Sequence, residues 1–193
     1  MPHQARIHSV QSMRAVVTFE SIYGNTRAVA EAVAEGLGSA GDVTVVSLHE
    51  ADPAVVAGGE LVVVGAPTHM HGLPTSLSRK IAAQASEEDG GTLDPGATAG
   101  PGIRSWLSEQ SGDGRYAAAF DTRADGRPAL TGSAARGIAK RLRKRGFEVV
   151  VEPESFLVED AEGPLADGEL ERAREWGSVI AAQVRATIQE TAR

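Results

Sequence analysis

The chain has 193 residues, which suits a single domain with a substantial hydrophobic core. Its formal net charge of −7 argues against a nucleic-acid-binding protein, because phosphate contacts need clustered Lys and Arg. There is no Cys, which excludes disulfides and thiolate chemistry. No apolar run approaches the roughly 18 residues of a membrane helix, and the first dozen residues lack the apolar core of a signal peptide. We therefore expect a cytoplasmic protein with a flexible tail over 1–12 and one domain over 13–193.

Five apolar runs are typical of β-strands. They cover residues 14–20, 43–48, 60–66, 115–121 and 147–151, and the last has a candidate continuation beyond Pro153 over 156–158. Helical patterns separate them at 25–38, after Pro53, from about Thr75 to Ser86, at 103–107, from Thr131 or Ser133 to Arg145, and at 167–191. This alternation favours a parallel sheet in a three-layer α/β/α sandwich. In the order 2-1-3-4-5, the loops after the first, third and fourth strands meet in one cleft, where such sheets bind ligands.

Two segments stand out by composition. Residues 86–102 are rich in Gly, Pro and acidic residues, which predicts a mobile surface excursion rather than a domain linker. A run of Lys and Arg lies between Arg136 and Arg145 on a predicted helix. It is either a solvated helix face or a docking site for an acidic redox partner.

The stretch Glu20–Thr26 joins the first strand to the first helix. Backbone N–H groups at a helix start are unpaired, and the helix dipole adds partial positive charge there. Ser21, Asn25 and Thr26 can add side-chain donors, and Gly24 allows the backbone to approach a ligand closely. The turn therefore predicts a phosphate site, with the alternative that its hydroxyl residues only cap the helix.

Two further loops follow the third and fourth strands. The first reads Pro67-Thr68-His69-Met70-His71-Gly72-Leu73-Pro74, and the second contains Asp121-Thr122-Arg123. His69 and His71 form a His-x-His pair, which is weak evidence for a metal site without Cys or a positioned third ligand. Asp121 and Arg123 are either a solvated pair at a strand end or a ligand-facing group in which Asp121 holds Arg123 in place.

These loops resemble those of the flavodoxin-like family. Ser21-Ile22-Tyr23-Gly24-Asn25-Thr26 is similar to the family's phosphate loop, a Ser/Thr-x-Thr/Tyr-Gly-Asn-Thr pattern. Gly65-Ala66-Pro67-Thr68 followed by Gly72 resembles its second flavin loop, and the resemblance covers about residues 14–191. More narrowly, the chain resembles flavodoxin-domain proteins common in high-GC actinobacteria at Ala66–His69, Ile103–Leu107, Ala119–Arg123 and Gly163–Leu165.

The resemblance implies bound FMN and electron transfer. The family's phosphate contacts fall here on Ser21, Tyr23, Gly24, Asn25 and Thr26. One side of the isoalloxazine would be lined by Pro67, Thr68, His69, Met70, His71 and Gly72, and the other by Asp121, Thr122 and Arg123. In typical flavodoxins, aromatic side chains from these loops sandwich the flavin. This sequence departs from that pattern, because its second loop offers His and Met, and its third loop has no aromatic residue after Phe120.

Two redox roles follow from the resemblance. One is a one-electron carrier between proteins, and the other is a small FMN-dependent oxidoreductase that accepts a hydride and reduces a molecule such as a quinone. The missing aromatic sandwich slightly favours the second. The alternative is a regulatory or binding domain of the same fold that has lost the flavin. The first and third strands do not end in the Asp residues that a receiver domain needs, and the signatures of dinucleotide-binding, P-loop and hydrolase folds are missing. We expect a redox partner protein or a small electron acceptor, and a homodimer is compatible with the sequence.

Overall fold

The computed structural model describes residues 13–69, 72–88, 93–125, 132–160 and 162–191. Its centre is a parallel sheet with strands β1 (Met13–Phe19), β2 (Gly41–Ser47), β3 (Leu61–Pro67), β4 (Tyr116–Ala124), β5 (Glu148–Val149) and β6 (Glu154–Val158). The order β2-β1-β3-β4-β5 confirms the predicted topology, and β6 pairs with β4 as a sixth strand. Leu61 to Ala66 are all buried, because helices cover both faces of this central strand.

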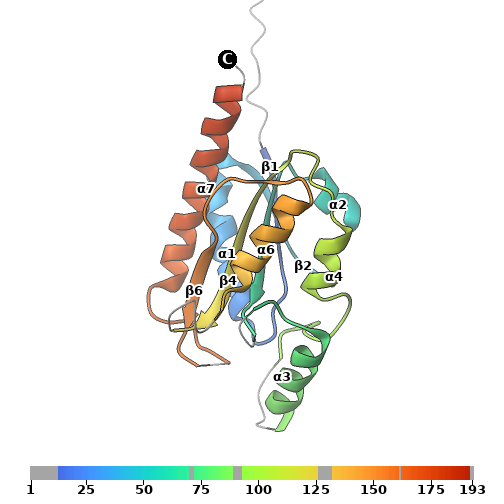
Figure 1. Cartoon of the computed structure of the whole chain (residues 1–193). Helices are drawn as coiled ribbons and strands as arrows, with labels where there is room; N and C mark the ends of the chain where they lie inside the picture. Colours follow the sequence, from blue (N-terminus) through green and yellow to red (C-terminus); the bar gives the residue numbers. More distant parts are fainter. Residues whose placement is uncertain (1–12, 70–71, 89–92, 126–131, 161, 192–193) are drawn as a thin grey trace, which may run out of the picture.

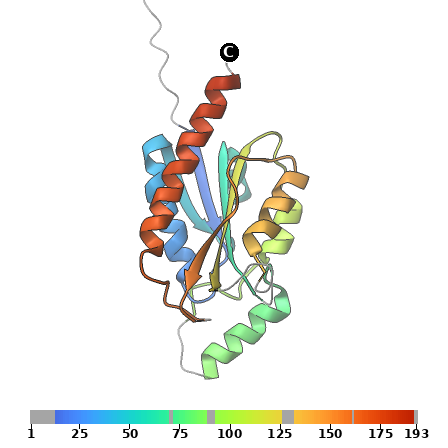
Figure 2. The same cartoon turned by 60° about the vertical axis from the view of Figure 1, so that its left-hand side comes forward.

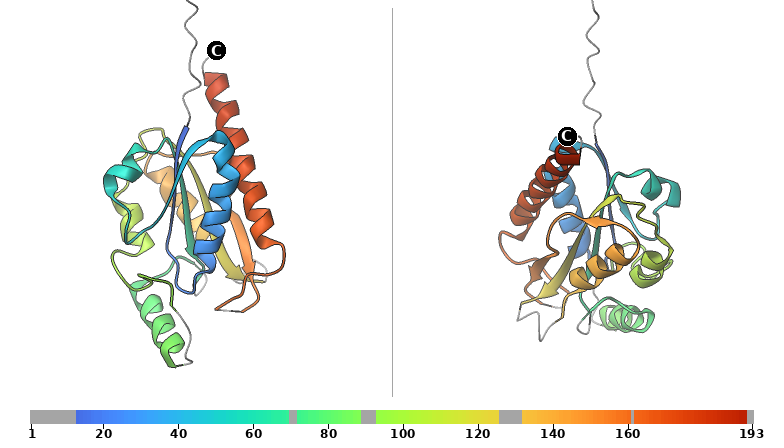
Figure 3. Two further views of the ribbon diagram at one scale, coloured as in Figure 1. Left: turned by 180° about the vertical axis from the view of Figure 1, so that it is seen from behind. Right: turned by 45° about the horizontal axis from the view of Figure 1, so that its top comes forward.

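Helices α1 (Asn25–Leu37) and α7 (Glu169–Thr191) cover one face of the sheet (Figure 1, Figure 2). The other face packs against α2 (Pro53–Gly58), α4 (Ile103–Glu109) and α6 (Ala134–Lys144). A short 3-10 turn, η1 (Gly38–Ala40), leads from α1 into β2. Helix α3 (Ser76–Glu88) extends beyond the carboxyl ends of the strands, away from the body of the domain (Figure 3). None of the described helices is long and apolar enough to cross a membrane.

The predicted fifth strand is divided into two pieces. β5 pairs with β4 at Tyr116 and Ala117, and β6 pairs with β4 from Phe120 to Ala124. Between the two pieces lies Pro153, which has no N–H to donate to a strand ladder. The prediction of one continuous strand over 147–151 is therefore wrong in its extent, whereas its suggested continuation over 156–158 is confirmed.

Helices α1 and α7 cross where both carry glycine. A Cβ atom on Gly36 would lie 2.0 Å from the carbonyl oxygen of Arg174, and one on Gly177 would lie 2.3 Å from that of Val33. The two backbones can approach this closely only because neither glycine has a side chain. Helix α7 extends past the sheet (Figure 1), and Ile188 near its end is 45% exposed.

The segment from Leu93 to Gly102 is packed against the domain. The N–H of Asp94 donates to the carbonyl of Ile22 at 2.7 Å, and its buried carboxylate accepts from Arg27 Nε at 2.8 Å. The segment is therefore anchored at Asp94, while Pro95 and residues 98–101 are exposed, so its predicted mobility stays a prediction. The predicted tail over 1–12 and Thr131, one of the two predicted starts of the helix that ends near Arg145, lie outside the described residues.

Candidate functional site

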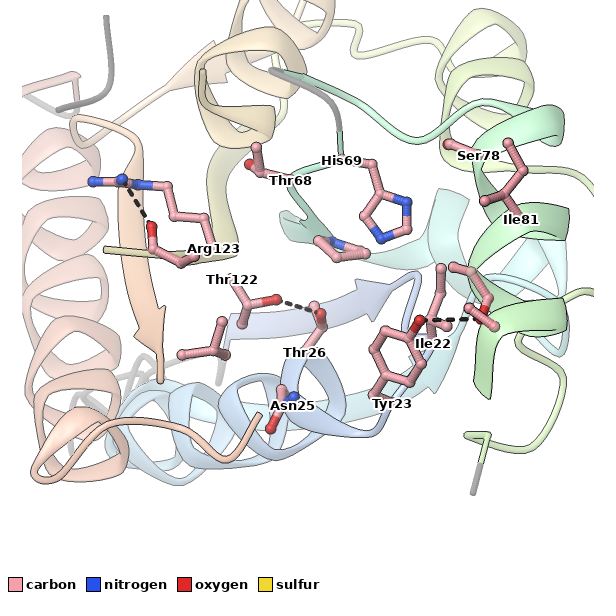
Figure 4. A pocket seen from close by; sticks show the side chains of 15 residues that line it. Ile22, Tyr23, Asn25, Thr26, Thr68, His69, Ser78, Ile81, Thr122 and Arg123 are labelled. Atoms are coloured by element: carbon pink, nitrogen blue, oxygen red, sulfur yellow. Dashed lines mark hydrogen bonds between the residues drawn. The ribbon is translucent and has the colours of Figure 1, made fainter. Parts of the chain in front are cut away.

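A cavity of about 350 Å³ opens at the carboxyl ends of β1, β3 and β4, beside α3 (Figure 4). Eight of the residues predicted from the sequence line it, namely Tyr23, Asn25, Thr26, Pro67, Thr68, His69, Thr122 and Arg123. The three predicted loops therefore do meet in one cleft. Four other predicted residues, Ser21, Gly24, Gly72 and Asp121, belong to the same loops but are not among the lining residues. Met70 and His71 lie outside the described residues.

The first turn of α1 presents unpaired backbone donors. Gly24 has a left-handed backbone, with φ of 87°, and its N–H donates to Ser21 Oγ at 3.2 Å. No side chain caps the helix, and its first internal hydrogen bond runs from Ala28 N–H to Gly24. Within the described residues, no hydrogen bond is found for the backbone N–H groups of Asn25 and Thr26. Unpaired N–H groups at a helix start, together with the helix dipole, are donors of the kind that bind an anion.

Two side chains of this turn link it to other loops. Thr26 Oγ1 lies 2.8 Å from Thr122 Oγ1, and both hydroxyls are buried. The side-chain amide of Asn25 donates to the carbonyl of Glu162 at 2.8 Å. Gly163 allows this approach, because a Cβ there would lie 2.5 Å from the same amide nitrogen. Neither of these two side chains caps α1, and the hydroxyl of Ser21 accepts from the N–H of Gly24 just before the helix.

The second loop turns sharply at His69. Its N–H and carbonyl both bond to the backbone of Gly72, each at 2.9 Å. This tight turn directs the imidazole into the cavity (Figure 4). Burial lowers the pKa of His69 below its usual value, so the ring is neutral at pH 7. In this state one ring nitrogen can donate a hydrogen bond and the other can accept one.

Asp121 supports the site without lining the cavity itself. Its Oδ2 accepts three hydrogen bonds, from Thr68 Oγ1 at 3.0 Å, Ser133 Oγ at 2.8 Å and Ala135 N–H at 2.8 Å. The residue is fully buried at the start of α6, where the helix dipole favours a carboxylate. The interpretation of Asp121 as a solvated partner of Arg123 is therefore wrong. Instead it fixes Thr68, which lines the cavity.

Helix α3 forms the remaining wall. It begins with reciprocal caps, in which the N–H of each of Thr75 and Ser78 donates to the hydroxyl of the other. The wall itself comes from Ser78, Ile81, Ala82 and Ala85. Tyr23 Oη donates to the carbonyl of Ala82 at 3.1 Å, and burial raises the pKa of Tyr23, with the nearby Glu162 adding to the shift.

A buried ion pair connects α3 to the end of β1. Arg79 Nε lies 3.8 Å from Glu20 Oε1, and Glu20 Oε2 accepts from the N–H of Ile103 at 2.7 Å. Burial raises the pKa of Glu20, while the Ile103 N–H and then Arg79 oppose that shift. Glu20 thus joins α3 and α4 directly beneath the first loop.

The family model described as Flavodoxin matches residues 17–176. The chain belongs to the flavodoxin family. The cofactor of that family is FMN, and its members transfer electrons to partner proteins. No protein of curated function matches the sequence.

Solved flavodoxins share the fold at low sequence identity. A flavodoxin from the domain Archaea is 23% identical with a TM-score of 0.61, and the match covers 90% of this chain and 99% of that one. A WrbA-like flavodoxin from Agrobacterium tumefaciens is 22% identical with a TM-score of 0.57, covering 91% and 99%. Flavodoxin 2 from Bacillus cereus is 18% identical with a TM-score of 0.59, covering 90% and 99%.

The residues of this flavodoxin-family chain fit FMN. The free N–H groups of α1 match a phosphate, and the cavity beside them continues to the second and third loops. Sequence reasoning missed the α3 wall and the supporting role of Asp121. A hint of the wall was present in Ile81 and Ala85, which are spaced by four residues on one helix face. Nothing in the sequence indicated the bonds of Asp121.

Proposed function

We propose that this cavity holds FMN, with the phosphate on the first turn of α1. The observation that carries the proposal is the uncapped helix start at Gly24, whose unpaired N–H groups adjoin the cavity. Thr26 adds a hydroxyl donor at this end. When bound, FMN supplies the redox chemistry by accepting and returning electrons, while the protein positions it and sets its potential.

The other end of the cavity would surround the isoalloxazine. There Thr68 and His69 offer hydrogen-bonding groups, and Arg123 adds positive charge that favours an electron-rich ring. Neutral His69 can donate to a ring acceptor or accept from a ring N–H. Of the described residues that line the cavity, Tyr23 is the only Phe, Tyr or Trp. An aromatic sandwich of the flavin is therefore not supported.

The wall of α3 supports a more specific role. Ile81, Ala82 and Ala85 give it an aliphatic surface, and Ile81 is also half exposed to solvent. A small apolar acceptor can contact this surface beside the flavin. We therefore infer an FMN-dependent oxidoreductase that passes two electrons to a small molecule of the quinone type.

Two measurements test this function. The absorption spectrum of the purified protein, with FMN added, should show bound flavin, and a colourless protein that does not bind FMN would contradict the proposal. Reductive titration then separates the two redox roles. A single two-electron step with rapid reoxidation by a quinone supports the oxidoreductase, whereas two resolved one-electron steps support a carrier between proteins.

A further inference from the structure

Helix α6 carries a concentration of positive charge in an otherwise acidic chain. Six of the 19 Lys and Arg residues lie between positions 136 and 145, where there is no Asp or Glu. Within the described residues, none of these six takes part in an ion pair. Arg141 and Arg145 donate instead to backbone carbonyls, those of Gly137 and Leu107. The other four cations have no partner of either kind in the part of the chain that the structure describes.

These four side chains form one stripe along the helix. We call them the basic stripe, and they are Arg136, Lys140, Arg143 and Lys144. Their spacing of four, three and one residues places them on one side, and all four are exposed. The opposite side of α6 is buried against the sheet through Ala135, Ile138 and Leu142. The stripe therefore faces outward from the domain.

Helix stability explains only part of this pattern. Cations in the last turn interact favourably with the helix dipole, which accounts for Arg143 and Lys144. Arg136 is the third residue of the helix, where the dipole is positive and a cation is unfavourable. Lys140 lies in the middle and gains from neither end. A solvated helix face usually mixes both charge signs at spacings of four residues, and α6 has no acid.

Helix α6, which carries the stripe, begins at the wall of the cavity. Thr68 lines the cavity, and its Oγ1 accepts from the N–H of Ala134, the first residue of α6, at 2.8 Å. From Arg136 to Lys144 the helix rises by about 12 Å. A partner that covers the stripe would thus reach the edge of the proposed FMN site.

We propose that the basic stripe is a docking surface for an acidic protein that supplies electrons to the FMN site. The proposal rests on the function proposed above. The stripe would attract an acidic partner, while the rest of this chain is acidic and would repel it. The partner would therefore approach with its acidic surface toward α6. A protein is favoured over a nucleic acid, since the stripe has no aromatic or amide side chain that would stack on bases or read them.

The test uses the FMN-loaded protein and a fluorescein-labelled polyglutamate peptide of about 20 residues, with binding followed by anisotropy. Affinity should fall about tenfold or more when salt is raised from low to physiological strength, as for an electrostatic contact. The variant Lys140→Glu/Arg143→Glu should lose about tenfold or more at low salt. The matched control, Arg14→Glu/Arg185→Glu, changes the net charge equally at exposed sites on other elements and should lose far less.

Several results would overturn the docking site. They are no binding of polyglutamate, an equal loss in both double variants, or tighter binding of a single-stranded DNA with the same number of charges. The variant Lys140→Arg/Arg143→Lys should retain binding, and circular dichroism checks that every variant is folded. Flavin absorbance of the same samples separates the two proposals. Failure to bind FMN defeats the proposed function, whereas FMN binding without polyglutamate binding defeats only the docking site.

Discussion

The two ends of the cavity are built from different interactions. At the α1 end, backbone N–H groups and the buried pair of Thr26 and Thr122 form the wall. At the α3 end, the wall is a projecting helix with aliphatic residues, of which Ile81 is 51% exposed. Among the described residues, Tyr23 bonds to this helix, and Arg79 of the helix forms a longer pair with Glu20.

This difference separates cofactor binding from acceptor binding. Buried hydrogen bonds require a ligand of fixed shape and charge, because any unmet donor carries a desolvation cost. An exposed aliphatic helix makes less directional contacts and can accept molecules of different shape. The α1 end therefore suits a constant group such as a phosphate, and the α3 end suits a variable acceptor. Substitutions on each side can break or sharpen this distinction.

The largest effect on stability is expected from a substitution of Asp121, whose carboxylate holds Thr68 in the wall of the cavity. Asp121→Ala would leave the donors of Thr68, Ser133 and Ala135 buried without their acceptor. We expect the free energy of unfolding to fall by about 3 kcal/mol, measured by urea denaturation. The control Ser133→Ala removes one of these bonds and the cap of α6, and should cost about 1 kcal/mol. Equal losses in the two variants would show that the carboxylate is not the common support.

The next largest effect is expected at Thr26, where a comparison with Thr122 distinguishes phosphate binding from simple packing. Thr26→Val and Thr122→Val each remove the same hydroxyl pair, so both should lower stability by about 1 kcal/mol. Only Thr26 belongs to the helix start that we propose for the phosphate. Thr26→Val should therefore weaken FMN binding by a further 1–3 kcal/mol or so, measured by quenching of flavin fluorescence. Equal FMN affinities in both variants would contradict this assignment.

A smaller effect is expected at the α3 end. Ile81 lines the cavity, while Leu77 lies one turn away on the same helix, is 69% exposed and is not a lining residue. Ile81→Ser should remove apolar contact worth roughly 1 kcal/mol, which would raise the KM for a quinone severalfold. The affinity for FMN should stay unchanged. Leu77→Ser is the matched control and should leave both unchanged. If Ile81→Ser weakened FMN binding instead, the two ends of the cavity would not be separable.

Sequence patterns predicted the parts of this site that depend on local chemistry. The unbroken apolar run from Leu61 to Val64 indicated a central strand, and Ser21 to Thr26 indicated an anion-binding turn before a helix. The structure confirms both the strand and the open helix start. In each case the pattern and its cause lie within a few neighbouring residues.

The contacts that escaped prediction join residues far apart in the chain. Asp94 pairs with Arg27 across 67 positions, and a segment rich in Gly and acid gives no sign of such an anchor. The sequence left open whether Asp121 is part of a solvated pair, as most carboxylates at the surface are, or a support for Arg123. The burial of Asp121 depends on the start of α6, twelve to fourteen residues later, folding back onto it. Such positions are set by tertiary packing, which a single sequence does not encode locally.

The smallest expected effect is a pH dependence at His69, where the two ends of the cavity meet. Burial lowers the folded pKa of His69 below the unfolded value of about 6.5. Below pH 6.5 the unfolded chain therefore binds more protons at this residue, so its contribution to stability is complete above that pH and declines as pH falls. His69→Gln should remove this contribution, so the difference in unfolding free energy between wild type and variant should shrink from pH 8 to pH 5. A difference that is constant over this range would place the imidazole in contact with solvent, and the second loop would then leave the cavity open on that side.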